Sequence, residues 1–113
     1  MSTTNTTSVF TFSETREIRT LMENGEPLFN ANDVCGVLEY ANSRDAIATH
    51  VDDDDVAKRE VIDTLGRSQQ ANYLTEAGVY SLIFGCQLPA AKNFKRWVTH
   101  EVLPQLRKVG FYG

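Results

Sequence analysis

The sequence predicts an α+β domain: an N-terminal β-meander with short helices, a hairpin, and two longer C-terminal helices. Two observations lead to this prediction. Residues 9–29 and 56–74 contain short runs of β-branched and aromatic residues separated by turn signals. Residues 75–109 instead carry apolar side chains at helical spacing. A chain of 113 residues is long enough for one domain with one hydrophobic core. We assign this domain to residues 9–113 and expect residues 1–8 to form a flexible tail.

The meander is predicted from alternating residues and one turn. Residues 9–12 and 18–22 are expected to be strands, because apolar side chains alternate with polar ones. Asn24-Gly25 suits a two-residue hairpin turn in which both residues adopt positive φ. The returning strand is residues 27–29, with Pro27 on an edge or at the strand start, since proline cannot donate a ladder hydrogen bond.

Two short helices are expected next. Asn30 is a suitable N-cap for the first, and Asp33 lies in its first turn, where the helix dipole favours an anion. Its apolar stripe consists of Val34, Val37 and Leu38. The second helix is expected to start at Asn42-Ser43 and to run toward His50, with Ile47 as its clearest apolar contact.

A hairpin follows an acidic loop at residues 52–55. We expect strands at residues 56–63 and 71–74, joined by residues 64–70 with Gly66 at the turn. Thr75 is then the predicted N-cap of a helix. The apolar stripe of that helix is Val79, Leu82, Ile83 and Cys86.

The last helix begins near Pro89, which is well placed in a first turn. Pro104 lacks an amide proton and clashes with the carbonyl of His100, so the helix should kink or restart there. The apolar side of the helix is formed by Phe94, Trp97, Val98, Val102, Leu106 and Val109. We expect Phe94 and Trp97 to pack in the core rather than to stack on bases.

Composition excludes several classes of protein. Hydrophobic residues make up 42% of the chain, too many for a disordered one, and no apolar run is long enough to suggest a membrane span. The N-terminus lacks a cation and an apolar segment, so no secretory signal is expected. Two cysteines are too few for a disulfide framework, which favours a reducing compartment.

The charge is unevenly distributed along the chain. The formal net charge is −4, which is not typical of a generic DNA binder. Residues 87–113, however, contain five Lys/Arg and one Glu, a net charge of +4. Residues 1–86 contain six Lys/Arg and fourteen Asp/Glu, a net charge of −8. Such asymmetry is a functional hint.

The cations of the last helix share one face. At ~100° per residue, Lys92, Arg96, Thr99, His100 and Arg107 project within one sector, opposite the apolar side. A solvated face of an amphipathic helix would show the same pattern. The functional interpretation is a surface that follows DNA phosphates. The predicted nucleic-acid-binding residues are Lys92, Lys95, Arg96, Thr99, His100, Arg107 and Lys108.

No catalytic, metal or cofactor site is predicted. Residues 52–55 fail as a calcium loop, because Val56 occupies the fifth position and the required glycine is absent. The available zinc ligands are Cys35, His50, Cys86 and His100, which include no close pair. Each cysteine is expected to be a small buried hydrophobe on a helix face. No nucleophile lies beside a base, and no Gly-rich phosphate loop is present, so an enzyme is not expected.

Taken together, these segments resemble the Bro-N domain, the N-terminal module of baculovirus BRO proteins and of many phage antirepressors. The resemblance covers about residues 9–112. Matching residues include 25–29 and 75–80, and the strongest and most specific match is the final block, residues 89–92, 94–99, 101–104, 106–108 and 110–112. The family often has Gly where Glu39 stands, and a Ser followed by basic residues where 86–88 stand.

The resemblance implies a non-enzymatic DNA-binding or regulatory module of a viral or prophage protein. In phages such a protein relieves repression by the prophage repressor, so the implied location is the bacterial host cytosol. Family members usually carry a second domain after the segment 110–112. The chain ends at Gly113, and we expect either a single-domain member or one part of a longer protein.

Two classes of function remain open from the sequence. The first is transcription control through weak, salt-dependent binding of duplex DNA by the last helix, as the basic face and the resemblance favour. The second is a protein-interaction module that sequesters a phage repressor or forms a homodimer, as the acidic excess before Gln87 favours. No membrane partner and no cofactor is expected in either case.

Overall fold

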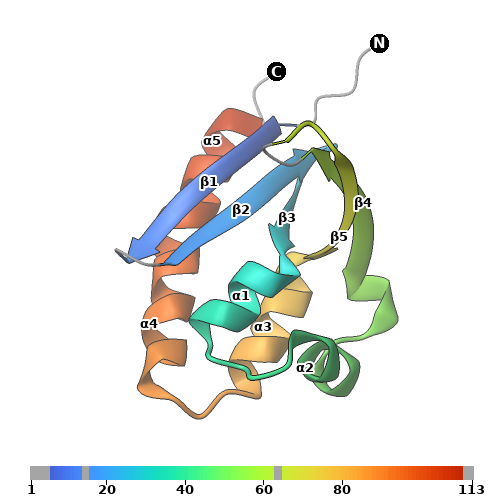
Figure 1. The fold of residues 1–113 in the computed structure, drawn as a ribbon. Coiled ribbons are helices and arrows are strands. Elements are labelled where there is room, and N and C mark those ends of the chain that lie inside the picture. Colours follow the sequence, from blue (N-terminus) through green and yellow to red (C-terminus); the bar gives the residue numbers. More distant parts are fainter. Residues whose placement is uncertain (1–5, 14–15, 63–64, 111–113) are drawn as a thin grey trace.

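The strands form one antiparallel sheet (Figure 1). The computed structural model describes residues 6–13, 16–62 and 65–110. The strands are β1 (Thr6–Ser13), β2 (Arg16–Glu23), β3 (Glu26–Asn30), β4 (Val56–Ile62) and β5 (Ser68–Leu74), and their spatial order is β1-β2-β3-β5-β4. The predicted meander and hairpin are confirmed. They are joined through β3 and β5, a pairing that the sequence did not indicate.

The turn between β2 and β3 has the predicted geometry. Asn24 and Gly25 have φ values of 54° and 82°, as a two-residue hairpin turn with positive φ requires. Pro27 pairs with Met22 of β2. On the other side of β3, only Phe29 and Asn30 pair with β5. Pro27 therefore sits at a strand start where no second neighbour needs its missing amide proton.

Two strand boundaries differ from the prediction. β1 begins at Thr6, so Thr7 and Ser8, which were assigned to the tail, pair with Leu21 and Thr20. β5 begins at Ser68 instead of residue 71, because Gln69 and Gln70 pair with Val61 and Glu60 of β4. Ladder pairing thus overrides the low strand propensity of this polar run. Residues 63–64, predicted to end one strand and begin the connection, lie outside the described residues.

The helices begin at the predicted caps. They are α1 (Ala31–Val37), α2 (Ser43–His50), α3 (Glu76–Phe84), α4 (Pro89–Trp97) and α5 (Leu103–Gly110), with a 3₁₀ turn η1 (Asp53–Asp55) and a π-helical turn η2 (Val98–Val102). The side chains of Asn30, Asn42 and Thr75 accept hydrogen bonds from amides of the first turns of α1, α2 and α3. No helix among the described residues is long and apolar enough to cross a membrane.

The helix α1 ends in a left-handed cap centred on Glu39. The amide of Glu39 donates to the carbonyl of Gly36 at 3.1 Å, and that of Tyr40 donates to Cys35 at 3.0 Å. This arrangement requires the positive φ of 60° that Glu39 adopts. Glycine adopts this conformation without steric cost, so it is the residue that suits this position best.

We therefore expect Glu39→Gly to stabilise the fold. The left-handed conformation costs a non-glycine residue roughly 1–2 kcal/mol, which the substitution removes. The greater conformational entropy of glycine in the unfolded chain reduces this gain by about 0.4–1 kcal/mol. The free energy of unfolding should rise by about 0.5–1 kcal/mol, measured by urea denaturation. Glu39→Ala is the control, because it retains the Cβ. An equal gain in both variants would contradict the explanation.

The core lies between the sheet and the C-terminal helices. Figure 1 shows α4 and α5 running along the back of β1 and β2 as one long helix, with α3 beside them. One buried cluster contains the predicted core residues Val34, Leu82, Ile83, Phe94, Val98 and Val102. Trp97 is half-buried and packs against this cluster. The core predicted for the last helix is therefore confirmed within the described residues.

Two local expectations need correction. The buried contact of α2 is Ala46, and Ile47 is only half-buried. Cys86 does not belong to the α3 stripe, because α3 ends at Phe84; its thiol instead lies 3.4 Å from the carbonyl oxygen of Leu38. By contrast, the kink or restart predicted at Pro104 is confirmed: the π turn Val98–Val102 contains His100, the amide of Leu103 donates to Val98, and α5 starts at Leu103.

Candidate nucleic-acid interface

The cations of the last two helices point away from the core. Phe94, Val98, Val102 and Leu106 are buried beneath α4, η2 and α5. The exposed residues of the predicted site are Lys92, Lys95, Arg96, His100, Arg107 and Lys108, and Thr99 is half-buried. The segment is therefore strongly amphipathic, and it presents most of the predicted site to solvent.

The polar contacts divide the predicted residues into two groups. The guanidinium of Arg107 lies 3.6 Å from the carboxylate of Glu76, so part of its charge is neutralised. The hydroxyl oxygen of Thr99 lies 2.9 Å from the carbonyl oxygen of Lys95, so its proton is used within the helix. By contrast, Lys92, Lys95 and Arg96 form no ion pair with any described residue. We call these three residues the basic face.

The π turn changes how the site is arranged. A π turn contains more residues than an α turn, because its hydrogen bonds span five residues. Residues after η2 are therefore rotated about the helix axis relative to their positions in a regular α-helix. The expectation that all predicted site residues share one sector at ~100° per residue does not hold for residues that follow η2. Arg107 is placed instead by its contact with Glu76, at the first turn of α3.

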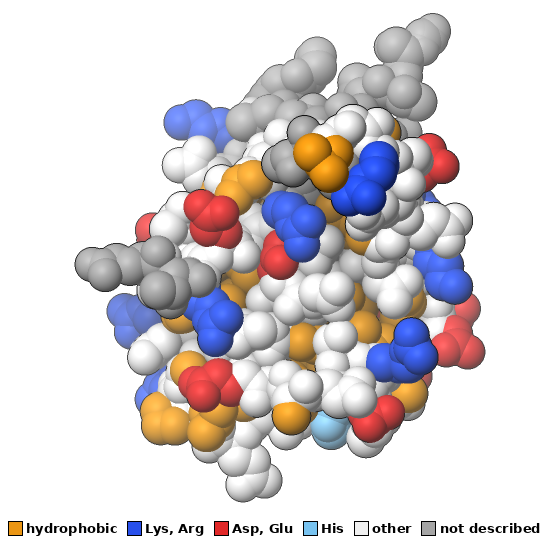
Figure 2. All heavy atoms as spheres, in the orientation of Figure 1, with side chains coloured by type: hydrophobic (Ala, Val, Ile, Leu, Met, Phe, Trp, Pro, Cys, Tyr) orange, Lys and Arg blue, Asp and Glu red, His pale blue; other side chains and the backbone are white. Residues whose placement is uncertain are grey.

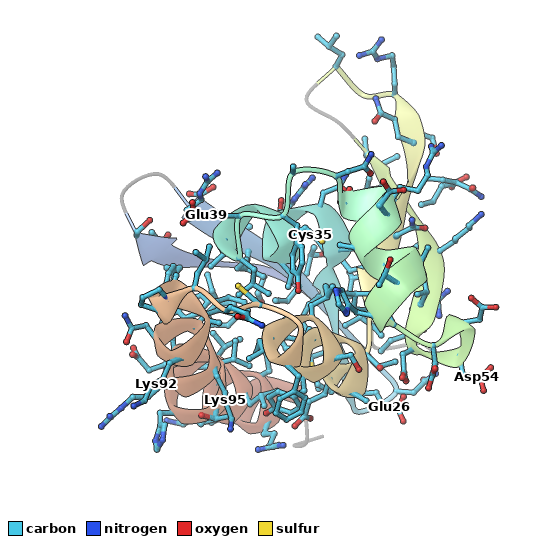
Figure 3. All side chains as sticks on the ribbon, turned by 90° about the horizontal axis from the view of Figure 1, so that it is seen from below. Glu26, Cys35, Glu39, Asp54, Lys92 and Lys95 are labelled. Carbon is cyan, nitrogen blue, oxygen red and sulfur yellow. The ribbon has the colours of Figure 1, made fainter. Side chains whose placement is uncertain are left out.

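The acidic segment lies far from the basic face. Figure 3 shows Lys92 and Lys95 pointing outward on one side of the molecule, and Asp54 at the opposite end. Asp54 belongs to η1, in which all three residues are aspartates. The field of the cations is therefore not cancelled by this segment, since exposed charges are screened beyond roughly 8 Å at physiological salt.

An apolar side chain accompanies the basic face. The ammonium of Lys95 lies 6.0 Å from the centroid of the Phe84 ring. Phe84 is 78% exposed and Leu88, the N-cap of α4, is 42% exposed. Neither residue was predicted from the sequence, although Phe84 lies off the apolar stripe expected for this helix, which was a usable signal. Phe84 and Leu88 add an apolar contact surface beside the cations, and phosphate binding would not require such a surface.

The aromatic residues of α4 are not available for stacking on bases. The ring of Trp97 packs against those of Phe12 and Phe94, with centroids 5.1 and 5.9 Å apart, and Phe94 is fully buried. Phe10 approaches Trp97 from the same strand at 6.5 Å. Recognition through α4 would therefore depend on charge and hydrogen bonding rather than on stacking.

The described residues offer little for catalysis. Burial raises the pKa of the Cys35 thiol to about 11, and this side chain is only 1% exposed, so it is neither ionised at neutral pH nor accessible. Burial, followed by the negative charge of Glu76, raises the pKa of Tyr80. No group of three or more His, Cys, Asp or Glu side chains that could hold a metal occurs in the described part of the chain.

Comparison with known proteins identifies the family. Residues 17–104 match the model of the N-terminal domain of the BRO family, Bro-N. The chain belongs to the Bro-N family. The matched residues run from Glu17 in β2 to Pro104 in α5, so they include strands β2 to β5, helices α1 to α4 and the basic face, but not β1. No solved structure matches the chain.

Relatives of this Bro-N domain occur in a bacterium and in invertebrate iridescent viruses. A Haemophilus influenzae protein, itself uncharacterized, is 38% identical over 106 residues, which are 93% of this chain and 52% of that protein. The 289L protein of Invertebrate iridescent virus 6, named for a Bro-N domain, is 35% identical over 103 residues, 76% of this chain and 25% of that protein. The chain thus spans about half of the first relative's length and a quarter of the second's.

Proposed function

We propose that this Bro-N domain is a DNA-binding regulatory module that acts in the control of prophage or viral transcription. The observation that carries the proposal is the basic face: Lys92, Lys95 and Arg96 are exposed on one helix and lack carboxylate partners among the described residues. This arrangement stands out in a chain with a net charge of −4. It suits contact with phosphates, which positions a protein on duplex DNA.

The proposed module needs no chemical step. We infer that it is not an enzyme, that it uses no cofactor, and that it acts in the cytosol, which is that of the bacterial host if a phage encodes it. Lys108 and His100 are exposed on the same helical segment and would extend the contact. Arg107 would contribute less, because Glu76 shares its charge.

A salt titration tests the proposal. Binding of a random-sequence duplex, followed by fluorescence anisotropy between 50 and 200 mM salt, should be weak and steeply salt-dependent. If three or four phosphates are neutralised, log K should fall against log salt with a slope of about −3 to −4. The absence of binding at the lowest salt concentration would refute the proposal.

A second candidate function is a protein-interaction module that sequesters a phage repressor or mediates homodimerisation. The exposed Phe84 and Leu88 beside the basic face favour it, because protein interfaces combine an apolar centre with a charged rim. In that case the domain should capture a repressor in a pull-down without binding DNA, and Phe84→Ser should abolish the capture. Sedimentation would detect the homodimer.

A further inference from the structure

A concave surface lies on the side of the molecule away from the basic face. It is a groove of about 850 Å³ between the β4–β5 hairpin, the start of α1 and the start of α2. Figure 3 shows α1 and α2 on one side of the molecule and Lys92 and Lys95 on the other. The groove is within the size range of specific ligand sites, and no single partner can contact both surfaces without wrapping around the domain.

The groove is lined by amides and cations. Its amide side chains are Asn30, Asn32, Asn42, Gln69, Gln70 and Asn72, and its cations are Arg19, Arg44 and Lys58. None of the lining residues is acidic, although residues 1–86 have a net charge of −8. Figure 2 shows Lys and Arg (blue) and Asp and Glu (red) side chains scattered over this side of the molecule, with white and orange atoms between them. The residues that line the groove, however, include three cations and no acid, so the groove is locally positive within an acidic part of the chain.

Two of the three cations are available to a ligand. The guanidinium of Arg19 is held by the carboxylate of Asp33 through two hydrogen bonds of 2.8 and 3.0 Å, so Arg19 belongs to the wall. Arg44 and Lys58 are exposed, and neither side chain forms an ion pair with a described residue. They lie on α2 and β4, on opposite sides of the groove.

One wall of the groove is an open strand edge. β5 pairs with β4 along its whole length, from Ser68 to Leu74. On its other side it pairs with β3 only at Tyr73 and Leu74. The four consecutive residues 69–72 line the groove. Consecutive side chains of a strand point to opposite faces of the sheet, so a surface that contacts all four residues runs along the edge of β5. Every second residue of such an edge directs its amide and carbonyl outward, as a template for another strand.

We propose that this groove binds an extended, acidic peptide segment of a partner protein. The segment adds as a strand to the open edge of β5, its carboxylates meet Arg44 and Lys58, and the exposed amide side chains of Gln70 and Asn72 hydrogen-bond its polar groups. The edge from Ser68 to Asn72 matches about five residues at ~3.4 Å each. None of the lining residues is aromatic, so the groove lacks the stacking surfaces that single-stranded nucleic acids require.

A model peptide tests this inference without depending on DNA binding. The probe is a labelled octapeptide of alternating Glu and Thr, titrated at low salt against the full chain. Binding should shift the backbone amide resonances of residues 69–72. Arg44→Glu with Lys58→Glu should weaken it at least about tenfold, because two attractions become repulsions. Both residues are exposed, so the melting temperature should stay unchanged.

The matched control is Lys92→Glu with Arg96→Glu, which makes the same change of net charge on the opposite side and should leave peptide affinity within about twofold. The same octapeptide with alternate amides N-methylated should not bind, because it cannot pair as a strand. No binding at millimolar peptide, or equal binding of the methylated peptide, would overturn the inference. So would loss of oligonucleotide binding, rather than peptide binding, in the groove variant.

Discussion

Replacing Phe94 with alanine should lower the free energy of unfolding by about 3–5 kcal/mol. The Phe94 side chain is fully buried where α4 meets the sheet, and its ring contacts those of Phe12 and Trp97 at 5.6 and 5.9 Å. Truncation removes the buried area and leaves a cavity that these two rings cannot fill. A domain of this size has a total stability of about 5–15 kcal/mol, so the loss is a large fraction of it.

The measurement is a thermal melt followed by fluorescence. At ~4 °C or more per kcal/mol, the melting temperature should fall by at least about 10 °C. Trp97 is the only tryptophan, so its emission reports directly on the site next to Phe94. Lys92→Ala, on the exposed side of the same helix, is the control and should change stability by no more than about 0.5 kcal/mol. An unchanged melting temperature in Phe94→Ala would show that α4 does not pack as described.

Reversing the charges of Lys92 and Arg96 to glutamate should abolish DNA binding by the domain. These residues supply two of the three unpaired cations of the basic face. The substitution removes two phosphate contacts and adds two repulsions, while the remaining contacts are few. Anisotropy with the duplex should therefore show no binding at a salt concentration where the unmodified chain is half-saturated.

The variant should fold as well as the original chain. Lys92 and Arg96 are both exposed, and they are four residues apart, so one like-charge pair replaces another. Arg44→Glu with Lys58→Glu makes the same change of net charge on the opposite side and should keep most of the affinity. If both double variants lose binding equally, net charge rather than the basic face governs the interaction, and the site is assigned wrongly.

Local structure was predictable wherever neighbouring residues decide it. The positive φ values of Asn24 and Gly25, the caps at Asn30 and Thr75, and the first-turn proline at 89 depend on side-chain and backbone chemistry within a few residues. The burial of Phe94 and Val98 follows from helical periodicity. The cations of the basic face lie on the opposite side of the same helix, so their exposure followed from the same pattern.

Features that depend on distant partners were not predictable. The polar run Ser68–Gln70 forms a strand because β4 pairs with it. The low strand propensity of these residues did not indicate this pairing. Arg107 pairs with Glu76, thirty-one positions away, and the π turn before Pro104 alters the register on which the site projection depended.

The sequence by itself determined the family, the α+β class, the core of the last helix and the basic face. Each depends on short-range spacing, which a chain displays before it folds. Tertiary structure alone decided that β5 joins β3 for only two residues and leaves its remaining edge facing α1 and α2. The groove arises from that pairing because it brings residues from five separate segments, 19, 30–32, 42–47, 58–61 and 69–72, to one surface. No local pattern encodes such a meeting, since its members are neighbours only in the folded chain.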